Sequence, residues 1–215
     1  MKTADWYFDF ISPYGYLQAA RLDELSRHAN IRPRPVLFAG LLNHHGQLGP
    51  AEIAPKRKFV FRQALWLAQR QGIPMQLPPA HPFKPLPPLR LAIAMGSDTE
   101  SIKTIFDFIW RDGNDIDNPD SFKQLTETLG LENAESRLAE PDVKQGLREN
   151  TEEAIARGVF GVPTLIVDDE IFWGNDSADQ FLDYLNDAAS MKRNIFDPVD
   201  GFAQSSVARK QSPAK

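Results

Sequence analysis

The sequence predicts an α/β fold in which a four-stranded mixed sheet carries an all-helical insertion. Three observations lead to this prediction: a strand, helix, strand unit opens the chain, a long stretch with helical periodicity follows, and a two-stranded hairpin with a last helix comes after it. A right-handed crossover makes the first two strands parallel. The hairpin strands are antiparallel, so the sheet as a whole is mixed.

The first strand is expected over residues 5–11, a near-continuous apolar and aromatic run typical of a strand covered on both faces. Asp9 interrupts this run. Ser12 and Pro13 then open a helix, because serine is a preferred N-cap and proline suits the first helical turn. An apolar stripe carries that helix to about Asn30.

The second strand is expected over residues 31–38. Pro33 and Pro35 alternate within it, which restricts the strand to an edge of the sheet. Residues 39–54 are rich in glycine and proline and predict a long loop.

From there to about residue 157 the periodicity is helical. Five helices are predicted, over 58–71, 88–95, 102–110, 119–129 and 141–157. The proline-rich span 77–88 predicts a rigid extended connector, with a polyproline ligand as the alternative interpretation.

The last elements are a hairpin and a helix. Strands 164–167 and 170–173 flank an Asp-Asp turn, and Asn175, Asp176 and Ser177 are expected to cap a helix that runs to about residue 188. The predicted organisation is a sheet domain made of 1–40 and 158–190, a helical insertion domain at 41–157, and a flexible C-terminal tail at 191–215.

Composition narrows the function. A net charge of −5 argues against nucleic acid as a partner, and no apolar run approaches membrane-spanning length or forms a signal peptide, so we expect a cytoplasmic protein. The chain has no cysteine, which excludes disulfides, a protein thiolate and disulfide oxidase chemistry. His44 and His45 lack further ligands at metal-site spacing, so no metal role is assigned.

Two distant segments point to a binding site. The turn after the first strand and the X-Pro before the third strand meet at one end of such a sheet, where a helix N-terminus favours an anion. A cis bond between Val162 and Pro163 would expose the backbone N–H and C=O of Val162, which could then pair with a peptide-like ligand as an added strand does.

The segments 8–17, 161–164 and 172–176 together resemble the 2-hydroxychromene-2-carboxylate isomerase family, relatives of the kappa-class glutathione transferases. The resemblance covers about residues 5–188. It implies a thioredoxin-like domain with a helical insertion, a homodimer, glutathione as cofactor and a small aromatic hydroxy-acid as substrate. The family's best-known reaction interconverts 2-hydroxychromene-2-carboxylate and trans-o-hydroxybenzylidenepyruvate in bacterial aromatic catabolism.

The resemblance also implies roles for particular residues. Ser12 would donate a hydrogen bond to the glutathione sulfur and so favour its reactive thiolate. Val162, held by Pro163, would pair with the cysteinyl backbone. The remaining expected contacts are Asn175 and Asp176 with the γ-glutamyl end and Lys56 with a carboxylate of glutathione or substrate.

Four residues depart from the family pattern. Phe59 stands where tyrosine is common, Gln63 where aspartate is common, and Trp66 and Ser177 where arginine is frequent. These departures leave the thiol site intact. They leave open the substrate and the electrostatics of the outer pocket.

Plainer interpretations remain beside these roles. Ser12 has the default reading of an N-cap, Pro163 of a strand-start proline, Asn175 and Asp176 of helix caps, and Lys56 of a solvated helix start. Trp110 is expected in the core. Two alternative functions also stay open: a kappa-like glutathione transferase that conjugates electrophiles, and a noncatalytic glutathione-binding protein of the thioredoxin fold.

Overall fold

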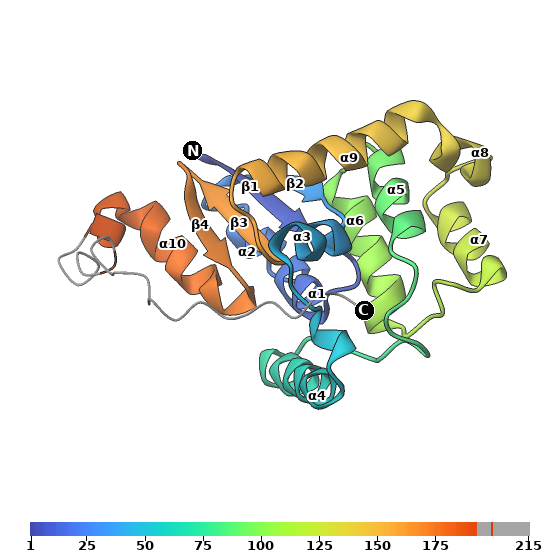
Figure 1. Cartoon of the computed structure of the whole chain (residues 1–215), viewed down its shortest axis with the longest axis horizontal. Coiled ribbons are helices and arrows are strands. Elements are labelled where there is room, and N and C mark those ends of the chain that lie inside the picture. Colours follow the sequence, from blue (N-terminus) through green and yellow to red (C-terminus); the bar gives the residue numbers. More distant parts are fainter. Residues whose placement is uncertain (193–198, 200–215) are drawn as a thin grey trace.

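The computed structural model describes residues 1–192 and residue 199 of the 215-residue chain. Its centre is a four-stranded mixed sheet in the order β2-β1-β3-β4 (Figure 1). The strands are β1 (Thr3–Phe8), β2 (Asn30–Pro35), β3 (Thr164–Val167) and β4 (Glu170–Trp173). β1 and β2 are parallel, whereas β3 pairs antiparallel with both β1 and β4. The predicted mixed sheet and the edge position of β2 are confirmed.

Helices surround this sheet and form the block between β2 and β3. The α-helices are α1 (Pro13–Ala19), α2 (Leu22–Leu25), α3 (Phe38–His45), α4 (Ala54–Gln71), α5 (Leu86–Ala94), α6 (Thr99–Phe106), α7 (Pro119–Thr128), α8 (Ala134–Ala139), α9 (Pro141–Ala156) and α10 (Ala178–Asn186). Shorter turns are η1 (Pro50–Glu52), η2 (Asp107–Arg111), which continues α6 as a π-helix, η3 (Asn175–Ser177) and η4 (Ala188–Lys192).

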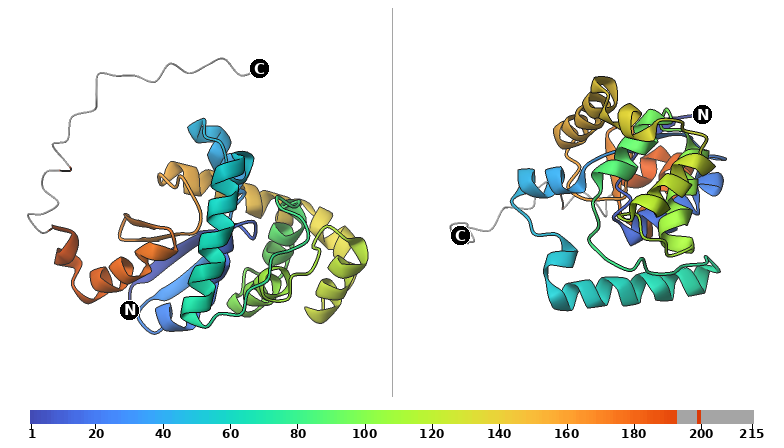
Figure 2. Two further views of the ribbon diagram at one scale, coloured as in Figure 1. Left: turned by 90° about the horizontal axis from the view of Figure 1, so that it is seen from below. Right: turned by 90° about the vertical axis from the view of Figure 1, so that its right-hand side faces the viewer.

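The alternation of β1 gives the sheet two different faces. Trp6 and Phe8 lie in the larger core with Phe106 and Trp110 of the helical block, so sheet and insertion share one continuous hydrophobic core. On the other face, Tyr7 packs in a smaller cluster with Val36, which follows β2, and with residues of α3, α9 and β3. Figure 1 shows α9 running along this side of the sheet, while α4 lies apart from the sheet in Figure 1 and in the right-hand view of Figure 2.

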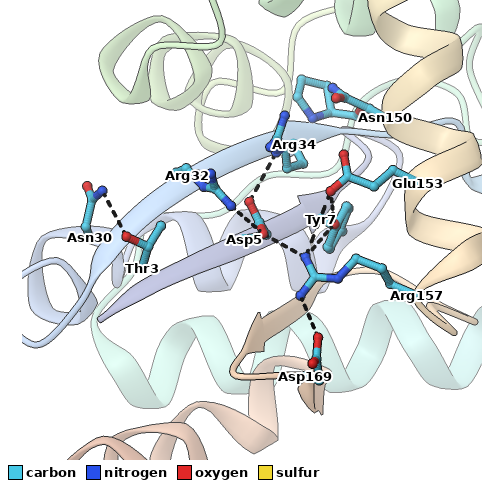
Figure 3. Close-up of polar contacts among 11 residues, drawn as sticks. Thr3, Asp5, Tyr7, Asn30, Arg32, Arg34, Asn150, Glu153, Arg157 and Asp169 are labelled. Atoms are coloured by element: carbon cyan, nitrogen blue, oxygen red, sulfur yellow. Dashed lines mark hydrogen bonds and ion pairs between the residues drawn. The ribbon is translucent and has the colours of Figure 1, made fainter. Parts of the chain in front are cut away.

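A polar network holds β1 to β2 and to the end of α9. The Asp5 carboxylate is buried and accepts hydrogen bonds from Arg32, Arg34 and Arg157 at 2.9, 3.1 and 2.7 Å (Figure 3). Arg157 also donates to the Tyr7 hydroxyl at 3.1 Å. Burial opposes ionisation of Asp5, but the three guanidinium groups outweigh it and hold the pKa of this carboxyl below its ordinary value.

The first strand and helix are shorter than predicted. β1 ends at Phe8 rather than at residue 11, because the Asp9 carbonyl accepts from Ser12 N and its carboxylate accepts from Ile11 N, both at 3.1 Å. The helix predicted to reach Asn30 divides into α1 and α2. The backbone of Arg21 lies at φ −96° and ψ 0°, outside regular helical geometry.

The predicted loop at 39–54 was wrong in part, because it contains α3 and η1. Gly40 lies inside α3, where a Cβ would sit 3.1 Å from Thr151 Cγ2 of α9. This glycine therefore permits close helix packing and does not break the helix. Gly46, at φ +62°, ends α3 in the left-handed region.

Five helices were predicted in the insertion, and each has a counterpart with shifted ends in α4, α5, α6, α7 or α9. α3 and α8 were missed. Asn133 precedes α8 in the sequence as a capping residue would, but its backbone lies at φ +52° and its side chain makes no capping hydrogen bond. The predicted capping of α10 was also wrong, since residues 175–177 form η3 and the Ser177 hydroxyl donates to the Gly174 carbonyl at 2.9 Å instead.

The predicted tail at 191–215 begins within η4, and residues 193–198 and 200–215 lie outside the described residues. Among the described residues, no helix has both the length and the apolar character required to cross a membrane.

Candidate active site

A cavity of about 640 Å³ opens where the β1–α1 turn faces the helical insertion. Its walls come from the turn at 9–14, from α3 and η1, from the start of α4, from the connector at 81–85 and from residues 160–162 with Trp173. Segments about 150 residues apart in the chain therefore meet at one site. The volume of this cavity lies within the range of typical small-molecule sites.

Ser12 lines this cavity and is buried. Its Oγ accepts from Gly15 N at 3.1 Å, which makes it the N-cap of α1. Its hydroxyl hydrogen is directed to the Val162 carbonyl oxygen at 3.4 Å, a long hydrogen bond. The capping role uses a lone pair and leaves the hydrogen available for a stronger acceptor.

Val162 is the second wall of the site. It lines the cavity, and no described residue accepts a hydrogen bond from its backbone N–H. The bond from Val162 to Pro163 is cis. Pro163 itself does not line the cavity; its carbonyl accepts from Gly174 N at 2.8 Å and so fixes the segment beside β4.

Asn175 and Asp176 follow β4 in η3 and lie outside the cavity lining. Asn175 is buried, yet its Oδ1 has no hydrogen-bond partner among the described residues. Asp176 is exposed. Burial raises the pKa of the Tyr14 hydroxyl, and the charge of Asp176 raises it further, which places Asp176 near this cavity residue.

Positive charge reaches the cavity from the first turn of α4. Lys56 and Arg57 both line it and are exposed to solvent. Further along α4, Gln63 accepts a hydrogen bond from the Tyr14 hydroxyl at 2.6 Å. Gln63 is one of the four departures from the family pattern, and here it links α4 to α1.

Asp9 was noted in the sequence only as an interruption of the strand. Its side chain is fully buried and lines the cavity, accepting from Ile11 N at 3.1 Å and Phe38 N at 2.9 Å. Burial raises the pKa of this carboxyl to about 7, although the two backbone donors lower it. Asp9 is therefore a cavity group that titrates near neutrality.

His81 forms part of the aromatic wall contributed by the insertion. Its Nε2 lies 2.9 Å from the Ile11 carbonyl oxygen, and its ring centroid lies 4.9, 5.9 and 5.9 Å from those of Phe61, Phe83 and Trp110. On the opposite side of the cavity, Phe160 and Trp173 pack edge to face at 5.0 Å. Trp110 is in the core, as predicted.

The position of Trp173 also explains why residue 161 of the site is a glycine. A Cβ on Gly161 would lie 2.4 Å from Trp173 Nε1, so only glycine permits this indole to cross the segment before Val162. Among the described residues, no group of three or more His, Asp or Glu side chains is placed to hold a metal ion.

The structure thus brings Ser12, Lys56 and Val162 together on one cavity. Asn175 and Asp176 are outside its lining, and the charge of Asp176 acts on Tyr14, which lines it. The structure also adds Asp9, Arg57 and His81, which sequence reasoning missed. A charged residue inside an apolar strand was the available signal for Asp9. His81 and Arg57 carried none, because their place on the cavity depends on how the insertion folds back.

Comparison with known proteins shows to which class this protein belongs. Residues 3–186 match the family of the DSBA-like thioredoxin domain. A 2-hydroxychromene-2-carboxylate isomerase of Sphingobium xenophagum is 32% identical over 86% of this chain and 99% of its own length. A solved 2-hydroxychromene-2-carboxylate isomerase superposes with a TM-score of 0.73 at 26% identity, covering 94% of this chain and 100% of that one.

The chain therefore belongs to the 2-hydroxychromene-2-carboxylate isomerase family within the DSBA-like thioredoxin domains. A second group of relatives consists of transferases. Glutathione S-transferase kappa 2 of Caenorhabditis elegans is 28% identical over 86% of this chain and 92% of its own length. The isomerase relatives support an isomerase role for this protein, and the kappa-class transferases stand near it.

Proposed function

We propose that this protein is a glutathione-dependent isomerase that interconverts 2-hydroxychromene-2-carboxylate and trans-o-hydroxybenzylidenepyruvate in aromatic catabolism. One observation carries the proposal: the Ser12 side chain lines a cavity in a chain without cysteine. The thiol that such a thioredoxin-like site handles must then come with a ligand. Glutathione is that ligand.

The Ser12 hydroxyl activates the thiol by donating a hydrogen bond to the sulfur. A hydrogen bond to a charged group contributes about 1.5 to 3 kcal/mol, which lowers the thiol pKa by about one to two units. The long bond to the Val162 carbonyl is weak, so the hydroxyl gives it up readily when the sulfur arrives. Because its lone pair caps α1, the oxygen stays in place during this exchange.

The thiolate then acts as a nucleophilic catalyst. The hemiketal C–O bond of the chromene ring breaks, which leaves the phenol oxygen protonated by the hemiketal hydroxyl and turns the hemiketal carbon into a ketone. The thiolate adds to the unsaturated carbon next to the aromatic ring, and the electron pair of the double bond moves to the ketone as an enolate. The former double bond is then a single bond about which the chain rotates. Expulsion of the thiolate restores the double bond in the trans geometry. The sulfur leaves as it came, so glutathione is not consumed.

The rest of glutathione is held by the neighbouring segments. The N–H of Val162 and the Oδ1 of Asn175 have no hydrogen-bond partner in the part of the chain that the structure describes. The N–H pairs with the cysteinyl backbone, and the Oδ1 accepts from the γ-glutamyl group. Asp176 pairs with the γ-glutamyl ammonium, and Lys56 with a terminal carboxylate. Pro163 positions Val162 for this contact.

The second candidate is a kappa-like glutathione transferase, favoured by the similarity to the kappa 2 protein of C. elegans. The two candidates differ in their products. Transfer yields a stable thioether and consumes glutathione, whereas isomerisation consumes none.

The test is ultraviolet absorbance of 2-hydroxychromene-2-carboxylate mixed with the protein, with and without glutathione. We expect conversion that depends on glutathione and leaves its concentration unchanged. Thioether formation with loss of glutathione would support the transferase. Glutathione binding without turnover of either kind would mean a noncatalytic binding protein.

We also propose that the protein is a cytoplasmic homodimer. The cytoplasm keeps glutathione reduced, as this chemistry requires. α4 exposes Phe59 and Trp66, which are 63% and 53% accessible, and apolar side chains of this kind are often covered by a second subunit. Light scattering of the purified protein gives the mass directly, and a monomer at micromolar concentration would contradict the dimer.

A further inference from the structure

We propose that Gln18 is a positioning residue for glutathione. Its amide holds the carbonyl of Gly174 and in this way sets the place of the Asp176 carboxylate, which receives the γ-glutamyl ammonium. This role deepens the proposed function and rests on it for the identity of the ligand and for the part played by Asp176.

The side chain of Gln18 is completely buried in α1, the helix that Ser12 caps. Its Oε1 accepts from Trp6 Nε1 at 2.7 Å, and its Nε2 donates to the Gly174 carbonyl oxygen at 3.2 Å. An indole N–H only donates and a carbonyl only accepts, so these two partners fix the orientation of the amide. A carboxylate or an apolar side chain of similar size would lose at least one of the two bonds.

Gly174 joins the segments that are proposed to hold glutathione. Its N–H donates to the Pro163 carbonyl at 2.8 Å, which ties it to the cis-proline segment. Its carbonyl oxygen accepts from Gln18 in α1 and from the Ser177 hydroxyl in η3, the latter at 2.9 Å. Of these contacts, the bond from Gln18 is the one that links the start of η3 to α1.

The backbone of Gly174 also determines where the side chain of Asp176 lies. Gly174 has φ +90° and ψ 162°, a conformation that is essentially confined to glycine. A Cβ at this position would lie 2.5 Å from Asp176 Oδ1, so the carboxylate lies directly against the glycine. A displacement of Gly174 therefore displaces this carboxylate.

Fixed placement matters because Asp176 is exposed to solvent. An exposed ion pair contributes little when two mobile groups must be ordered to form it. Holding one of the two groups in place before binding removes part of that cost. Gln18 does not line the cavity, so it acts on the ligand through Gly174 and without contact of its own.

The experiment compares the affinities of glutathione and N-acetylcysteinylglycine by calorimetric titration. The second compound keeps the thiol, the cysteinyl backbone and the glycyl carboxylate but lacks both charges of the γ-glutamyl group. The unaltered protein should prefer glutathione. Gln18→Met, which is close in volume and removes both hydrogen bonds, should weaken glutathione binding about fivefold or more and leave binding of N-acetylcysteinylglycine unchanged.

Two further variants separate positioning from stability. Gly174→Ala breaks the same link from its other end and should give the same selective loss, because alanine disfavours this backbone conformation and its Cβ would displace the Asp176 carboxylate. Trp6→Phe removes the other bond of the Gln18 amide. It should lower the free energy of unfolding, measured with urea, and keep the preference for glutathione, since Nε2 still faces the Gly174 oxygen.

Three results would overturn the positioning role. Equal weakening of both ligands by Gln18→Met, or an equal loss of the preference in Trp6→Phe, would assign Gln18 to support of the core alone. An unchanged preference in Gln18→Met would show that the link to Gly174 does not matter for binding. No preference of the unaltered protein for glutathione would mean that there is no γ-glutamyl contact to position. None of these measurements requires turnover, so a failure of isomerisation stays distinguishable from a failure of this role.

Discussion

The Ser12 hydroxyl lies 3.4 Å from the Val162 carbonyl oxygen, and this contact joins two turns that are 150 residues apart in the chain. The same oxygen caps α1 by accepting from Gly15 N. One side chain therefore fixes the start of a helix and faces the segment proposed to hold the ligand. The plain N-cap reading of Ser12 and its proposed chemical role are compatible, because they use different parts of the hydroxyl.

The first prediction separates these two roles. Ser12→Ala should lower the free energy of unfolding by about 1 kcal/mol through loss of the cap. It should also lower the isomerisation rate at least tenfold, since the thiolate of bound glutathione loses its donor. Ultraviolet difference spectra report the thiolate directly, and Ser12→Thr should retain it. An unchanged thiolate signal in the alanine variant would leave Ser12 as a cap only.

The second prediction concerns the orphan acceptor in η3. Asn175→Ala should weaken glutathione binding about tenfold while leaving the free energy of unfolding nearly unchanged, because Oδ1 bonds to no described residue. Calorimetric titration with glutathione and urea unfolding provide the two measurements. A large loss of stability with normal glutathione affinity would show a structural role instead.

The third prediction follows from the pKa of about 7 at Asp9. The folded protein binds a proton that the unfolded chain releases at its ordinary value of 3.8, so this group lowers stability as pH rises from about 4 to 7. Asp9→Asn removes that dependence. Urea unfolding at several pH values should show a wild-type curve that declines relative to the variant across this window, and parallel curves would contradict the raised pKa.

The fourth prediction concerns Asp5, whose effect on the pH dependence of stability is opposite to that of Asp9. The pKa of Asp5 lies below its ordinary value, so its stabilisation is present above pH 4 and is lost as pH falls through the lowered pKa. Asp5→Asn should cost about 2 to 4 kcal/mol at pH 7, because a buried ion pair loses one member. The difference from wild type should shrink in acid. Asp179→Asn, which breaks one exposed pair with Arg21, should cost less than about 1 kcal/mol.

Prediction from the sequence succeeded where local signals were strong. The hairpin at 164–173 has the predicted bounds, since β-branched and aromatic runs flank a two-residue turn. Prediction failed where contacts between distant parts of the chain determine the secondary structure. Gly40 looked like a loop residue, and only its close approach to Thr151 explains why it lies in a helix.

The candidate site divides in the same way. Ser12, Val162 and Pro163 were found from short motifs, because a cap and an X-Pro are local features of the chain. The sequence also determined by itself the mixed α/β sheet, its helical insertion and the absence of any protein thiol. Only the tertiary structure decided that Asp9, Arg57 and His81 share the cavity with Ser12. The charge and hydrogen-bond state of a side chain depends on what surrounds it, and those surroundings come from segments far apart in the sequence.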